Sequence, residues 1–76
     1  MSDRRRALLK QAGERLAANG IETATLDARL LFQAATGLRH EDIVAEPELM
    51  VPPDIASRFS TFIDRRCKFE PVSRIL

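Results

Sequence analysis

The 76-residue sequence contains one cysteine, one histidine, three glycines and no tryptophan or tyrosine. A single cysteine, Cys67, excludes an internal disulfide. His40 alone cannot build a zinc site, because no cysteine or glutamate stands near it at ligand spacing. Three scattered glycines form no glycine-rich phosphate loop. These absences favour a helper domain over a catalyst, with no catalytic, cofactor-binding or metal-binding residue.

The chain also lacks an excess of charge of one sign. Twelve Lys and Arg residues against eleven Asp and Glu give a formal net charge of +1, which disfavours a nucleic-acid clamp or a polybasic membrane binder. No apolar stretch approaches the roughly 20 residues of a membrane span, and no apolar signal-peptide core follows the N-terminal arginines. We therefore expect a cytoplasmic chain, with no membrane and no direct nucleic acid among its partners.

Helical periodicity predicts an all-α fold, a small bundle of four to five helices with short loops. The expected helices cover about residues 3–19, 24–36 and 53–68, with a short helix between residues 38 and 46 and a further turn within 71–76. We interpret residues 1–76 as a single domain. Residues 48–51 are expected to be a connector, because a lone strand there has nothing to pair with.

Helix ends carry the usual signals. Glycines follow the first two helices, as Asn19-Gly20 and Thr36-Gly37, and prolines open the fourth. Side chains that can start the first two helices are Ser2, Asp3, Thr23 and Thr25.

Two charged residues interrupt the apolar stripes that should face the core. Asp27 lies in the stripe of Leu30, Leu31, Ala34 and Ala35, and Arg66 lies in the stripe of Ile55, Phe59, Phe62 and Ile63. One interpretation is a ligand or partner site between the helices. The favoured one is a structural ion pair, because buried charges are usually paired. Arg5 also falls on an apolar face and is a second candidate partner for Asp27.

Other basic residues are candidates for binding a partner: Arg4, Arg6, Arg65 and Lys68. Arginines at the start of a helix oppose its dipole, a cost that can mark an anionic partner. A fraying terminus and a mixed solvated face are the simpler interpretations. His40 is interpreted as a capping or surface residue, and Cys67 as an inert residue at a helix end.

Two segments resemble the bacterial release-factor glutamine methyltransferases, the HemK/PrmC family. They are Thr25-Leu-Asp-Ala-Arg-Leu-Leu31 and Phe62-Ile-Asp-Arg-Arg-Cys-Lys-Phe-Glu-Pro-Val-Ser-Arg-Ile-Leu76. In that family, such segments flank a helical N-terminal domain, and the chain after Glu-Pro continues into a β-hairpin linker. The sequence departs from the pattern at Arg74, where the family more often carries an aromatic residue or histidine.

The resemblance implies a parent enzyme that uses S-adenosylmethionine to methylate the glutamine of the Gly-Gly-Gln motif in class I peptide-chain release factors. The implied partners are the release factor and the enzyme's own catalytic domain, and the implied role of this chain is substrate recognition. The family's Asn-Pro-Pro-Tyr motif belongs to the catalytic domain. The Pro-Pro here lies between Val51 and Asp54, so no catalytic or cofactor role transfers to this chain.

Two other functions stay open. One is a small helical DNA-binding module whose second helix presents Arg29 and Gln33, although residues 19–24 are long for a helix-turn-helix connection. The other is a free-standing helical adaptor.

The C-terminal residues suggest a chain cut from a longer protein, with 71–76 as the start of a linker. The apolar side chains near this end are Phe69, Val72, Ile75 and Leu76. We expect them to be partly exposed or to pack loosely on the bundle.

Overall fold

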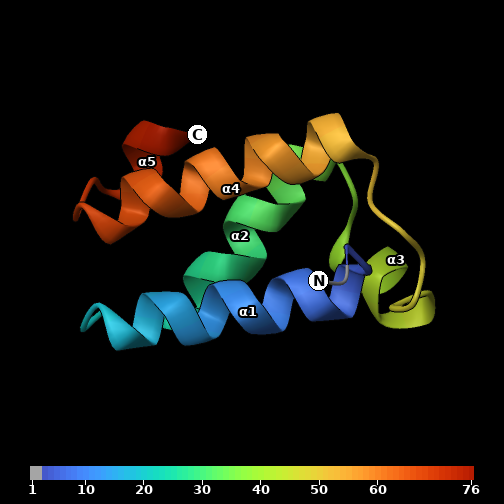
Figure 1. Ribbon diagram of the computed structural model, residues 1–76, viewed down its shortest axis with the longest axis horizontal. Coiled ribbons are helices and arrows are strands. Elements are labelled where there is room, and N and C mark those ends of the chain that lie inside the picture. The colour runs from blue at the N-terminus through green and yellow to red at the C-terminus, as the bar shows by residue number, and fades with distance from the viewer. Residues whose placement is uncertain (1–2) are drawn as a thin grey trace.

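The computed structural model describes residues 3–76, so the predicted helix-starting role of Ser2 lies outside the described residues. The helices are α1 (Arg5–Ala18), α2 (Ala24–Thr36), α3 (His40–Ala45), α4 (Pro53–Cys67) and α5 (Val72–Ile75). α1 and α4 run in the same direction and contact each other, and α2 crosses both and packs against each of them (Figure 1). The prediction of a small all-α bundle is confirmed. Across residues 3–76, no helix has the length and apolar character needed to span a membrane.

The glycine signals at the helix ends are followed, but the predicted N-terminal caps are not. Arg4, not Asp3, occupies the position before α1, and no side chain caps that helix. Gly20 and Gly37 adopt left-handed backbone angles, with φ of 82° and 75°, after α1 and α2. Thr23 occupies the position before α2, but its hydroxyl makes no capping bond to the helix backbone. That hydroxyl donates instead to the carboxylate of Asp27.

The prediction that residues 48–51 have no pairing partner is wrong. Met50 and Arg4 form an isolated antiparallel bridge. The Val51 amide donates to the Asp3 carbonyl at 2.8 Å, and the Arg5 amide donates to the Leu49 carbonyl at 3.0 Å. The partner is the extended backbone that leads into α1, a segment expected to be helical. The backbone amides and carbonyls of these two segments have no helical partner, and they bond to each other although the segments are far apart in the sequence.

The core is built around α2. Phe32 and Leu31 are completely buried, and the Phe32 ring meets that of Phe59 edge-on at a centroid distance of 5.1 Å. Ala34, expected in the apolar stripe, is exposed. The buried face of α2 includes Ala28 instead, because α2 packs against both α1 and α4.

The C-terminal turn packs on the bundle more firmly than expected. α5 lies against α4 and α2, and Ile75 is buried in the core. Val72 is half-buried, whereas Phe69 and Leu76 are each 63% exposed. The apolar residues of this segment therefore divide into two that anchor α5 and two that face outward.

Gly13 lies in the middle of α1, where a Cβ atom would meet nothing within 4 Å. Because glycine costs more backbone entropy than alanine in a helix, Gly13→Ala should raise the free energy of unfolding by about 0.5–1 kcal/mol. Urea unfolding monitored by circular dichroism measures the change. The matched controls, Gly20→Ala and Gly37→Ala, should destabilise, since both glycines have positive φ. A destabilised Gly13→Ala variant would contradict the prediction.

Candidate functional site

The structure brings Asp27 and Arg66 into direct contact. The Nε atom of Arg66 donates to Oδ2 of Asp27 at 2.9 Å. The Asp27 side chain is 7% exposed and that of Arg66 is 19% exposed, so water screens this pair weakly. Arg5, the second candidate partner, does not contact Asp27.

The remaining polar atoms of the pair are also bonded. The Thr23 hydroxyl donates to the same Asp27 oxygen at 3.0 Å, and Nη1 of Arg66 donates to the Glu70 carbonyl at 3.4 Å. Within residues 3–76, no buried side-chain nitrogen or oxygen lacks a hydrogen-bond partner. A buried ion pair is tolerated when further hydrogen bonds satisfy its charged groups, and this pair meets that condition.

Local sequence places the two charges at helix ends of opposite polarity. Asp27 lies in the first turn of α2, and Arg66 lies in the last turn of α4. A carboxylate is stabilised at the positive end of a helix dipole and a guanidinium at the negative end. Each helix therefore stabilises its own charged residue, and the pair joins the start of α2 to the end of α4.

Arg65 makes a second ion pair beside the first. Its Nε and Nη2 atoms donate to the two carboxylate oxygens of Glu70, at 2.8 and 2.5 Å. These hydrogen bonds hold the pKa of Glu70 below its ordinary value, with a smaller contribution from the charge of Arg74. Phe69 lies between the paired residues with a left-handed backbone, φ 63°. Together these contacts fix the turn that sends the chain from α4 into α5.

The four basic residues predicted to bind a partner do not form one patch. Arg4 Nη1 donates to the Glu48 carbonyl at 2.8 Å, and Arg6 forms an ion pair with the Glu48 carboxylate at 2.7 Å. Both therefore lie where α1 begins. Arg65 and Lys68 lie at the end of α4, on the other side of the molecule from that point (Figure 1). Of the four, only Lys68 makes no hydrogen bond or ion pair within residues 3–76.

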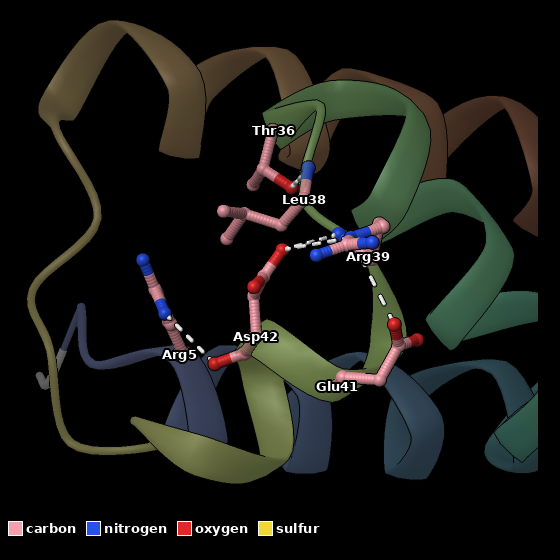
Figure 2. Close-up of polar contacts among 6 residues, drawn as sticks. All are labelled: Arg5, Thr36, Leu38, Arg39, Glu41 and Asp42. Carbon is pink, nitrogen blue, oxygen red and sulfur yellow. Dashed lines mark hydrogen bonds and ion pairs between the residues drawn. The ribbon is translucent and has the colours of Figure 1, made fainter.

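Arg5 binds the end of α3. Its Nη1 atom donates to the carbonyls of Asp42 and Glu46 at 3.2 and 3.4 Å. These carbonyls also accept hydrogen bonds from the backbone amides of Glu46 and Leu49. Figure 2 shows Arg5 reaching Asp42 from α1 while the Arg39 amide donates to the Asp42 carboxylate at 3.0 Å. Sequence reasoning missed this role because the partners are separated by about forty positions and the acceptors are backbone atoms.

The loop before α3 is held by Thr36. Its hydroxyl accepts a hydrogen bond from the Leu38 amide at 3.1 Å (Figure 2). The same hydroxyl donates to the Phe32 carbonyl at 2.8 Å. The chain is thus guided from α2 into α3. His40 begins α3 and is exposed, as a surface residue would be.

A groove of about 560 Å³ lies between α1, α2 and α3 and was not anticipated from the sequence. We call it the α1–α2 groove. Its apolar lining comes from Leu9, Gly13, Ala17, Ala28 and Ile43, and its charged and polar lining includes Lys10, Glu14, Arg29 and His40. The available signal was the spacing of Leu9, Gly13 and Ala17, which places small residues on one face of α1.

No metal centre is formed by the described residues. Within 3–76, no three His, Cys, Asp or Glu side chains gather in a way that could hold a metal ion. Cys67 is half-buried at the end of α4 and is not in a disulfide. The polar contacts of the chain act mainly between helix ends.

The fold and these contacts define a compact all-α domain whose helix ends are joined by charged side chains and which carries a groove between α1, α2 and α3. Comparison with protein families shows that the chain belongs to the PrmC N-terminal domain family, whose model matches residues 7–76.

Curated relatives support the same membership. A protein of Agrobacterium fabrum named release factor glutamine methyltransferase is 43% identical over 70 residues, which is 92% of this chain and 24% of that protein. Proteins of the same name from Caulobacter vibrioides and Bradyrhizobium diazoefficiens are 32% and 40% identical, over 86% and 82% of this chain and 22% and 21% of their own length. The chain thus spans about a quarter of the relatives it matches. No solved structure matched it.

Asp27→Ala should lower the free energy of unfolding by about 2–4 kcal/mol, because it leaves the Arg66 guanidinium without its partner in a mostly buried position. Urea unfolding measures this loss. Asp64→Ala provides a matched control, since Asp64 pairs with Arg15 on the surface and both side chains are about half exposed. The control should cost less than about 1 kcal/mol.

A double-mutant cycle of Asp27→Asn and Arg66→Met separates the pair from its surroundings. If the loss of stability in the double mutant equals the sum of the two single losses, the coupling energy is zero. That result would show that the contact between the two side chains contributes nothing, and would contradict the prediction.

The pKa of Glu70 should rise toward its ordinary value in Arg65→Met, because this change removes the hydrogen bonds that lower it. Arg74→Met should raise it less, since Arg74 acts only through its charge. NMR titration of the Glu70 side chain measures both. The pair stabilises the fold above the unfolded-state pKa of glutamate, and this contribution is lost as the pH falls through the lowered folded-state pKa. Equal pKa values in Arg65→Met and the wild type would contradict the assignment.

Proposed function

We propose that this chain is the N-terminal recognition domain of an S-adenosylmethionine-dependent methyltransferase. The complete enzyme would methylate the side-chain amide of the glutamine in the Gly-Gly-Gln motif of class I peptide-chain release factors. The observation that carries the proposal is membership of the PrmC N-terminal domain family over residues 7–76. The shared name of three relatives, which are about four times longer, supports the enzyme and its substrate.

Cofactor binding is assigned to the part of the enzyme outside this chain. Residues 3–76 do not fit S-adenosylmethionine, because their glycines do not form a glycine-rich loop. Gly13 lies within α1, and Gly20 and Gly37 follow two different helices. The chain's own contribution is therefore binding and orientation of the protein substrate, a role for which a rigid helical surface is suited.

The exposed apolar side chains near the C-terminus fit contact with the enzyme's catalytic domain. Phe69 lies on the turn fixed by the Arg65–Glu70 ion pair, Leu76 follows α5, and each is 63% exposed. Large apolar groups that stay exposed beside a rigid turn are typical of surfaces that another domain covers. We assign these two residues to that contact.

The DNA-binding alternative has no supporting contact. Arg29 is exposed at the α1–α2 groove, but Gln33 is half-buried. A recognition helix must present such residues together to the bases, and the net charge of +1 provides little attraction to phosphates. Duplex DNA therefore becomes a negative control.

The chain should bind an unmethylated class I release factor with one-to-one stoichiometry in isothermal titration calorimetry. In excess, it should also slow methylation of that release factor by the Agrobacterium fabrum relative, because both would occupy the same surface. Duplex DNA at the same salt concentration should give no heat of binding. Absence of both binding and inhibition would overturn the proposed function.

A further inference from the structure

We propose that the α1–α2 groove is the surface that receives the protein substrate, and that the segment bound there is apolar with acidic side chains beside it. This assignment rests on the proposed function, and it adds which surface binds and what chemistry it selects. Lys10 and Arg29 are the residues inferred to pair with the acidic groups.

The groove has the dimensions and lining of a binding site. Its volume of about 560 Å³ falls within the range of ligand-binding clefts, and three helices contribute to its walls. Ala28 and Ile43 are buried beneath it and Leu9 is half-buried, so the deeper lining is apolar. Grooves between helices with an apolar base commonly bind the apolar face of a peptide segment.

Two basic side chains beside the groove are not used internally. Across residues 3–76, five basic side chains make no hydrogen bond or ion pair, and they are Lys10, Arg29, Arg58, Lys68 and Arg74. Two of these five line the groove. The other basic residues interact with acidic side chains or backbone carbonyls. Lys10 and Arg29 are therefore available to a partner bound in the groove.

Glu14 lines the same groove but does not neutralise these cations. It lies one turn after Lys10 on α1, an order in which the pair is weaker than glutamate before lysine. No ion pair joins the two. The two cations and one carboxylate leave an excess of one positive charge, which favours an acidic partner.

Gly13 supplies an independent observation. Its backbone needs no left-handed angle, and a Cβ atom would meet no atom within 4 Å, so neither local geometry nor internal packing requires glycine there. Gly13 nevertheless lines the groove, between Leu9 and Ala17. A missing side chain at this point allows another chain to approach the backbone of α1 closely.

The experiment compares Arg29→Glu with Arg58→Glu. Both arginines are exposed, lie on helices and lack an internal partner, so each variant changes the net charge equally without removing a described contact. Affinity for an unmethylated class I release factor, measured by calorimetry, should fall about tenfold for Arg29→Glu and for Lys10→Glu. Arg58→Glu should change it less than about twofold. Equal losses in Arg29→Glu and Arg58→Glu would show a general charge effect and overturn the assignment.

Gly13→Leu tests the groove without changing any charge. The added side chain should occupy the groove and reduce affinity about tenfold, while the folded state is retained because leucine favours helices. In the wild-type chain, NMR should show the release factor shifting the amide signals of Gly13, Ala17 and Ala28. Binding with unchanged affinity in Gly13→Leu and unshifted signals would overturn the groove assignment and leave the proposed function intact. A wild-type chain that does not bind the release factor overturns both.

Discussion

The carboxylate of Asp27 is the constraint on which the arrangement of helices depends. It is buried on α2, the helix that packs against both α1 and α4, and a domain this small cannot bear an unpaired buried charge. Arg66 satisfies it at 2.9 Å, from the last turn of α4. The first turn of α2 and the end of α4 are therefore held at one point, and the Phe32–Phe59 contact follows between the same two helices.

The same arginine connects this packing to the path of the chain beyond α4. Arg66 also donates to the Glu70 carbonyl, and Arg65 donates two hydrogen bonds to the Glu70 carboxylate. Between them, Phe69 takes a left-handed backbone, which non-glycine residues seldom adopt unless their surroundings require it. One cluster thus fixes both the helix crossing and the direction in which α5 returns to the core through Ile75.

Two sets of charged side chains in this chain have different roles. Arg5, Arg65 and Arg66 act on helix ends and loops, where they donate to backbone carbonyls and pair with carboxylates. Lys10 and Arg29 make no hydrogen bond or ion pair within the described residues and border the α1–α2 groove. In the proposed recognition domain, substitutions at Lys10 and Arg29 can therefore change the charge of the groove without removing the ion pairs and hydrogen bonds that hold the bundle.

By itself, the sequence determined the all-α class and the second helix at residues 24–36, because apolar periodicity and glycine caps act over a few neighbouring residues. It also marked Asp27 as a charge on an apolar face. Two arginines met the same description, and only the packing of α4 on α2 decided between Arg66 and Arg5. The bridge between Arg4 and Met50 and the α1–α2 groove likewise join residues far apart in the chain. Such contacts depend on how whole helices pack, which no local pattern specifies.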